Sequence, residues 1–170
     1  MSSTLALLAR VEQAYRSEAA LLDAGDLAAW LEWLHPDFRY EVPIPVTREG
    51  AGARGYSTRG LLAVETRPTI ELWARRLSED HIATAYAENA PNRTRHFVTN
   101  VQVEPTDNAA ELRVVSNILL SWNWRGQPPA FATAQRCDVL VDDGDDLILR
   151  DRRILLDCDV VHLNHLRVIF

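Results

Sequence analysis

Three side chains suited to acid–base or anion chemistry lie close together in segment 92–101: Arg93, Arg95 and His96. A histidine can move a proton near neutral pH, and an arginine can hold a carboxylate through two parallel hydrogen bonds. In a strand the two arginines share one face, whereas His96 and Asn100 point to the other face. For the arginines, a subunit contact or an internal ion pair is favoured over a site for an anionic substrate.

A second group of residues could support acid–base chemistry in a pocket. Helices that cap a curved sheet can enclose a conical pocket, where a buried carboxylate or histidine with a shifted pKa could abstract a proton next to a carbonyl. The candidates for such a pocket are Asp37, Tyr40, His96 and Asp138. Each also has an ordinary structural interpretation, as a strand start, a packed ring or a hydrogen-bonded side chain, and these structural roles are favoured.

The spacing of cysteines and histidines argues against a metal centre in this chain. A Rieske cluster or a structural zinc site needs paired ligand motifs, which neither Cys137 nor Cys158 provides. Asp159, His162 and His165 have the composition of a two-histidine, one-carboxylate iron site. In a strand, however, a three-residue step sends the two histidines to opposite faces, unless a bulge intervenes. We therefore expect no metal or other cofactor here.

Composition and charge are those of an ordinary soluble protein. The 170 residues fit one domain spanning 1–170, with 47% apolar and 25% charged residues. Eighteen basic against 24 acidic residues give a net charge of −6, which argues against nucleic-acid binding. We expect no signal peptide and no membrane span, because no stretch approaches roughly 18 apolar residues. Reduced, buried cysteines and a cytoplasmic location are the matching expectations.

The apolar periodicity predicts helices at the start of the chain and a strand after them. Helices are expected over 8–22 and 27–34, the first ending at Gly25 and the second capped by Asp26. A half-buried strand follows over 38–42. Two prolines, Pro43 and Pro45, confine that strand to a sheet edge or to a strand end.

The rest of the chain predicts a long loop, one helix and a series of strands. Residues 47–67, rich in glycine and arginine, are expected to form the loop, and Pro68 to begin the helix. Alternating apolar residues predict strands at 97–103, 112–124, 131–141, 147–156 and 160–170. Helices first and an antiparallel meander after them indicate an α+β domain, with the N-terminal helices packed on one face of a curved antiparallel sheet.

The run Ala-Tyr-Ala-Glu-Asn-Ala-Pro-Asn-Arg-Thr-Arg-His-Phe-Val-Thr-Asn-Val, residues 85–101, closely resembles a family signature. It is similar to the signature of the small (β) subunit of aromatic-ring-hydroxylating dioxygenases, usually Trp-Ala-Glu-Asp-Pro-Pro-Ser-Arg-Thr-Arg-His followed by Ser-Asn-Val. Residues 18–43 and 152–157 look like the family's N- and C-terminal patterns, so the resemblance covers nearly the whole chain. Asn92 and His165 depart from the usual Ser and Asn, which bears on subgroup and substrate.

The resemblance implies a cystatin-like fold of the nuclear transport factor 2-like type, a cone of helices on a curved sheet. It also implies a β homotrimer that holds three catalytic α subunits in an α3β3 hexamer, acting in the catabolism of aromatic compounds. In that family the α subunit carries the Rieske 2Fe-2S cluster and the mononuclear iron, and the β subunit is mainly structural. The assembly or interface candidates are Arg93, Arg95, His96, Asn100 and His165.

Two other functions stay open because one fold hosts many activities. The first is a stand-alone isomerase or dehydratase that uses a pocket histidine, aspartate or tyrosine for proton transfer. It would require a polar residue with a perturbed pKa inside a closed apolar pocket. The second is a homotrimeric binding module without an α partner. If the chain is a β subunit, the pocket for the aromatic substrate lies in another chain.

Overall fold

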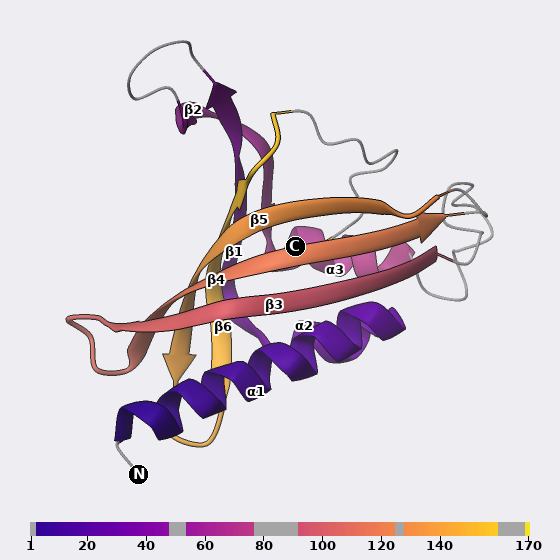
Figure 1. The fold of residues 1–170 in the computed structure, drawn as a ribbon. Coiled ribbons are helices and arrows are strands. Elements are labelled where there is room, and N and C mark those ends of the chain that lie inside the picture. Colours follow the sequence, from indigo (N-terminus) through magenta and orange to yellow (C-terminus); the bar gives the residue numbers. More distant parts are fainter. Residues whose placement is uncertain (1–2, 48–53, 77–91, 125–127, 160–168) are drawn as a thin grey trace.

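The computed structural model describes residues 3–47, 54–76, 92–124, 128–159 and 169–170 (Figure 1). In chain order the elements are α1 (Ser3–Ala24), α2 (Leu27–Glu32), β1 (Leu34–Thr47), β2 (Arg54–Thr66), α3 (Arg67–Arg76), β3 (Asn92–Pro105), β4 (Glu111–Trp124), β5 (Ala130–Asp142) and β6 (Leu147–Leu156). The predicted α+β class, with N-terminal helices packed on a curved sheet, is confirmed.

The strands form one six-stranded sheet in the order β2-β1-β6-β5-β4-β3. All neighbours are antiparallel except β1 and β6, whose parallel pairing joins the first strand of the chain to the last described one. The sheet is therefore not the simple antiparallel meander expected. In Figure 1 the long strands β3, β4 and β5 curve together, and α1 lies along β3.

The first helix follows from an apolar stripe and a glycine stop. Val11, Tyr15 and Leu22 are buried and recur at helical spacing. Gly25, with φ of +74°, ends α1, and its backbone N–H donates to the carbonyl of Leu22 at 3.1 Å. Asp26 then caps α2 by accepting a hydrogen bond from the backbone of Ala29 at 3.0 Å. The roles predicted for Gly25 and Asp26 are confirmed.

The expected loop over residues 47–67 is largely wrong, because 54–66 form β2. Glycines lowered the apparent strand propensity of this segment, but at Gly60 a glycine is what the pairing needs. A Cβ atom there would lie 2.7 Å from the Cδ1 atom of Ile44 on the neighbouring strand. Such close approach of two strands is a recognised role of glycine within a sheet.

The first strand is longer than predicted and does not lie at the sheet edge. Pro43 and Pro45 are within β1, at register shifts in its pairing with β2. The pairing of β1 with β6 ends at Glu41, so both prolines lie where β1 has one neighbouring strand instead of two. A missing N–H is tolerated at such positions. The helix predicted over 27–34 is also shorter than expected, because α2 ends at Glu32 and β1 begins at Leu34.

A bulge in β3 changes which residues face inward. The pairing with β4 shifts between Thr99 and Gln102, and Asn100 has a left-handed φ of 53°. Val98 packs against the core before the bulge and Val101 packs against it afterwards. Asn100 is exposed, but it lines the same hollow beside α1 as His96, so the shared face stays a prediction.

Two further expectations concern regions at the limits of the described chain. Of the strand expected at 160–170, residues 160–168 lie outside the described residues, and Ile169 and Phe170 are buried without being in a strand. No helix among the described residues has the length and apolar character needed to cross a membrane.

The left-handed backbone at Asn100 predicts an asymmetric response to substitution. Asn100→Val should lower the free energy of unfolding by about 1–2 kcal/mol, because a β-branched residue is strained at positive φ. Asn100→Gly should change it by roughly 1 kcal/mol or less, since glycine adopts this conformation freely. Urea unfolding followed by circular dichroism measures both, and equal midpoints for the two variants would contradict the bulge conformation.

Candidate functional site

The inside of the cone holds four buried charged side chains, here called the ion-pair network: Glu18, Arg136, Asp138 and Arg152. They come from α1, β5 and β6, and each residue is at most 2% exposed. Strand alternation puts Arg136 and Asp138 on one face of β5, and the β5–β6 register places Asp138 directly opposite Arg152. Helical spacing puts Glu18 in the same stripe as the apolar residues of α1.

Arg152 lies at the centre of the network and binds both carboxylates through two hydrogen bonds each. Its Nη1 and Nη2 atoms lie 2.5 and 3.1 Å from the carboxylate oxygens of Glu18. Its Nε and Nη2 atoms lie 3.0 and 2.8 Å from those of Asp138. Arg136 adds a contact of 2.5 Å from Nη2 to Glu18. Two guanidinium groups thus face two carboxylates, and the formal charges cancel.

Neutral groups complete the surroundings of the network. The hydroxyl of Tyr15 donates to Asp138 at 2.8 Å, and the indole N–H of Trp30 donates to Glu18 at 3.2 Å. The guanidinium of Arg136 also lies over the Tyr15 ring, 5.0 Å from its centre. Within the described residues, two buried polar atoms have no hydrogen-bond partner, the Oγ of Ser116 and the Nε of Arg136, which belong to paired residues of β4 and β5.

The network holds Glu18 and Arg152 in their charged forms. Burial alone would raise the pKa of Glu18, but the charges of Arg136 and Arg152 and their hydrogen bonds outweigh it and lower this pKa to about 2. Burial opposes the charge of Arg152, yet Asp138 and Glu18 raise its pKa well above the ordinary value. Burial, together with the charge of Asp138, raises the pKa of Tyr15, which therefore stays a hydroxyl donor.

His96 joins three parts of the chain that lie far apart in sequence. Its Nδ1 atom lies 2.6 Å from the carboxylate of Asp23 on α1, and its Nε2 atom lies 2.8 Å from the carbonyl of Ile169. Its backbone N–H also donates to Asp23 at 3.3 Å. Both ring nitrogens face oxygen acceptors, so both bonds form only when each nitrogen carries a proton. The ring is thus fully engaged as a tether.

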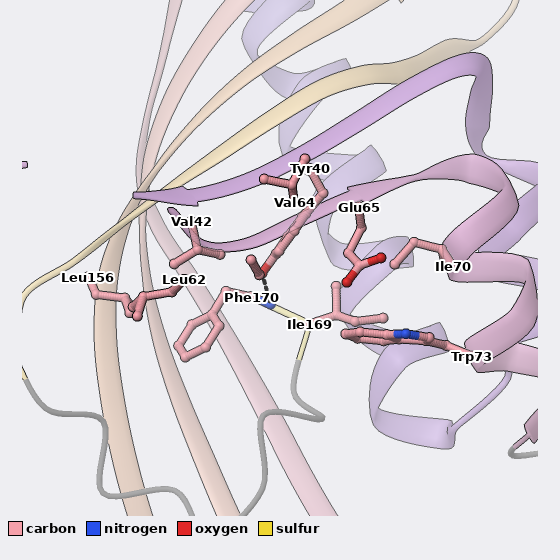
Figure 2. Close-up of a pocket in the computed structure, with 11 residues that line it drawn as sticks. Tyr40, Val42, Leu62, Val64, Glu65, Ile70, Trp73, Leu156, Ile169 and Phe170 are labelled. Atoms are coloured by element: carbon pink, nitrogen blue, oxygen red, sulfur yellow. Dashed lines mark hydrogen bonds between the residues drawn. The ribbon is translucent and has the colours of Figure 1, made fainter. Parts of the chain in front are cut away.

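An apolar cavity of about 290 Å³ lies between β1, β2, α3 and the C-terminal residues (Figure 2). Tyr40 reaches into it, and its hydroxyl accepts a hydrogen bond from the backbone N–H of Phe170 at 3.4 Å. Burial raises the pKa of Tyr40 to about 12. Phe170 lines the cavity and also contacts the network, because its backbone oxygen accepts a hydrogen bond from Arg152 at 3.3 Å.

A family model described as the ring hydroxylating beta subunit matches residues 17–163 of this chain. The chain belongs to the ring-hydroxylating β-subunit family. The matched range includes all four residues of the network as well as the 92–101 segment. The residues quoted for the resemblance therefore identified the family correctly.

Solved structures have the same fold as this β subunit. One is naphthalene 1,2-dioxygenase with indole bound in the active site, with a TM-score of 0.79 at 22% identity, covering 97% of this chain and 86% of that one. Another is the benzoate 1,2-dioxygenase β subunit of Burkholderia mallei, with a TM-score of 0.68 at 19% identity over 91% and 96%. A candidate scytalone dehydratase of Novosphingobium aromaticivorans has a TM-score of 0.63 at 14% identity over 93% and 89%.

Of the four residues predicted to share a pocket in the β subunit, Tyr40 and Asp138 lie on either side of Arg152 in the sheet, and Asp37 lies apart from them. Asp37 is wrong as a pocket residue, because its side chain is 87% exposed beside His35 at the start of β1. Tyr40 lines the cavity, Asp138 belongs to the network, and His96 forms the tether. Local sequence patterns do not show which inward-facing residues converge, because sheet curvature decides that.

The cluster around His96 divides as strand parity predicted. Arg93 and Arg95 are exposed on the outward side, and His96 is turned inward with its side chain only 3% exposed. Of the candidate iron ligands, Asp159 is exposed, and His162 and His165 lie outside the described residues. The described part of the chain holds no group of three or more metal-ligating side chains.

Sequence reasoning missed Glu18, Arg136 and Arg152 as partners and misjudged β5. The expected apolar face included Phe131, which is 63% exposed, whereas Arg136 and Asp138 face inward. Apolar alternation fails here because charged residues occupy the buried side. The available signal was Glu18 in an apolar helix stripe, with two arginines to pair with it.

Both cysteines of the β subunit are free and half-buried, so the expectation of buried thiols is only partly met. Cys137 on β5 lies opposite Arg153, five residues before Cys158, so the two cysteines do not face each other across β5 and β6. They form no disulfide with each other.

Removing the central arginine should leave both carboxylates short of a partner. Arg152→Met should lower the free energy of unfolding by about 3–5 kcal/mol, the usual effect of leaving a buried charge unpaired. The matched variant Arg16→Met removes an exposed arginine paired with Glu12 on α1 and should cost less than about 1 kcal/mol. Urea unfolding measures both variants, and a similar loss in the two would contradict the central role of Arg152.

The lowered pKa of Glu18 predicts how stability depends on pH. The unfolded chain takes up this proton near the ordinary value of 4.5, and the folded chain near 2. The contribution of Glu18 is therefore complete above pH 4.5 and is lost as the pH falls toward 2. The urea midpoint should fall less steeply across this range in Glu18→Gln than in the wild type. Glu12→Gln, at an exposed position, should keep the wild-type slope; loss of slope in both variants would count against the assignment.

Proposed function

We propose that this chain is the non-catalytic, structural β subunit of an aromatic-ring-hydroxylating dioxygenase that acts in the catabolism of aromatic compounds. It forms a homotrimer and holds a catalytic α subunit in an α3β3 hexamer. The Rieske cluster and the mononuclear iron belong to the α subunit, and this chain binds neither. The cytoplasmic location expected from the sequence stays a prediction.

The ion-pair network is the observation that supports a structural role most directly. In the interior of the cone, each carboxylate is committed to a guanidinium group and to a neutral donor. An acid–base catalyst needs a group that can gain or lose a proton near neutral pH. Glu18 with a pKa of about 2 and Arg152 with a raised pKa meet no such need.

Exposed apolar residues on the outward face of the sheet support self-association. This outer patch consists of Phe97, Leu119 and Phe131, which are 52%, 39% and 63% exposed. Phe97 lies opposite Leu119, and Ser121 lies opposite both Arg95 and Phe131, so Arg95 lies beside the patch. A cluster of large apolar side chains next to an arginine is typical of a protein–protein interface.

The alternative is a stand-alone isomerase or dehydratase of the same fold. The Tyr40 cavity and the fold similarity to a candidate scytalone dehydratase favour it. Of the residues proposed for its chemistry, however, Asp37 is exposed, Asp138 is bound by Arg152, and both ring nitrogens of His96 face oxygen atoms. The structural role is therefore the better supported of the two.

Assembly and metal content test the proposed function. The purified chain should be a trimer at micromolar concentration by light scattering and should contain no iron. Co-expression with a neighbouring α-subunit gene should yield an iron-containing complex of both chains. Arg95→Ala should shift the purified chain toward smaller species, whereas Arg16→Ala on α1 should not. A monomeric wild type that captures no α subunit, or stoichiometric iron in the chain alone, would refute the proposal.

A further inference from the structure

We propose that the cavity between β1, β2, α3 and Phe170 is a binding site for a small, uncharged hydroxyarene. The proposed function assigns no ligand to this chain, and the residues that line the cavity all come from this one chain. Ligand binding at this site does not require the α subunit, and the residues that line the cavity need not catalyse a reaction. Binding can therefore be measured on the purified chain.

The size and lining of the cavity set the class of ligand. A cavity of roughly 150 Å³ already holds benzene, so the volume of about 290 Å³ suits one or two fused rings. The lining is mainly aliphatic and aromatic, with the rings of Trp73, Phe170 and Tyr40 among its walls (Figure 2). Aromatic walls favour a flat aromatic ligand, which they contact by stacking and edge contacts.

Glu65 supplies the acceptor that selects the polar group of the ligand. Figure 2 shows its carboxylate close to Ile70, Trp73 and Ile169, on the lining of the cavity. Among the described residues, this half-buried carboxylate has no hydrogen-bond or ion-pair partner, in contrast to Glu18 in the network. A carboxylate can only accept, so the ligand must bring an O–H or N–H donor. The same negative charge disfavours an anionic ligand such as an arene carboxylate.

Tyr40, which lies directly opposite Glu65 in the pairing of β1 with β2, adds a donor beside this acceptor. Its oxygen already accepts from the backbone of Phe170, which leaves its own O–H free to donate toward the ligand. With a pKa raised to about 12, this hydroxyl keeps its proton at neutral pH. A ligand hydroxyl both donates and accepts, so a hydroxyarene can satisfy Glu65 or Tyr40, whereas an aryl ether or an arene carboxylate cannot donate to Glu65.

Three two-ring probes of similar size test this selectivity on the full chain near pH 7. Calorimetric titration should give saturable binding of 2-naphthol, and it should be about tenfold or more tighter than that of 2-methoxynaphthalene, which lacks the donor. The anion 2-naphthoate should not bind measurably. Equal affinity for all three probes, or no saturable binding of 2-naphthol, would overturn the proposal.

Two variants assign the binding to this cavity. Glu65→Gln removes the charge with little change of shape, so 2-naphthol should weaken about tenfold and 2-naphthoate should now bind. Glu104→Gln, an exposed change of the same kind on β3, should leave both affinities unchanged. Ala63→Leu narrows the cavity and should abolish binding of 2-naphthol, with thermal unfolding as a check of folding. Unchanged 2-naphthol binding in both Glu65→Gln and Ala63→Leu would place the ligand elsewhere and refute the site.

Discussion

Four buried charges must pair with one another, and this requirement fixes how the first helix and the last described strands pack. An unpaired ion in the interior costs several kcal/mol, so Glu18 and Asp138 must each meet a guanidinium group. This requirement allows α1 only one rotation and one height along the sheet, because a turn of the helix would remove Glu18 from Arg152. It also fixes the register of β5 against β6, since a shift of one residue would send Arg152 to the opposite face.

The network also divides the molecule into regions with different roles. The centre of the cone is polar, and its formal charges cancel. The tether formed by His96 attaches Ile169 to α1. Beyond Phe170, the interior is apolar and hollow, bounded by the β1–β2 pair and α3. The outward face of β3 to β5 presents the exposed aromatic residues. Other proteins with this fold are enzymes. In this chain the ion-pair network fills the interior of the cone, and the apolar cavity lies to one side of the network.

Features that depend on local rules could be predicted, and those that depend on sheet curvature or pairing could not. The stop at Gly25 and the cap at Asp26 follow from backbone conformation and hydrogen bonding alone. The second strand was missed because Gly60 serves a close contact with β1 that no local pattern encodes. On β5 the buried face carries Arg136 and Asp138, so apolar alternation pointed to the wrong side. The family signature compensated for these failures, since it does not depend on knowing which side chains meet.

The long sequence separation within the network has a consequence for synthesis on the ribosome. Glu18 is made early, but its partners Arg136 and Arg152 follow 118 and 134 residues later. At roughly 5–20 residues per second, the nascent helix waits on the order of ten seconds before its carboxylate can be neutralised. During that interval α1 exposes an apolar stripe interrupted by a charge. Burying this stripe would also bury the carboxylate of Glu18 before its arginine partners have been made. Pairing of the buried glutamate with both arginines therefore cannot be completed before β5 and β6 have been synthesised.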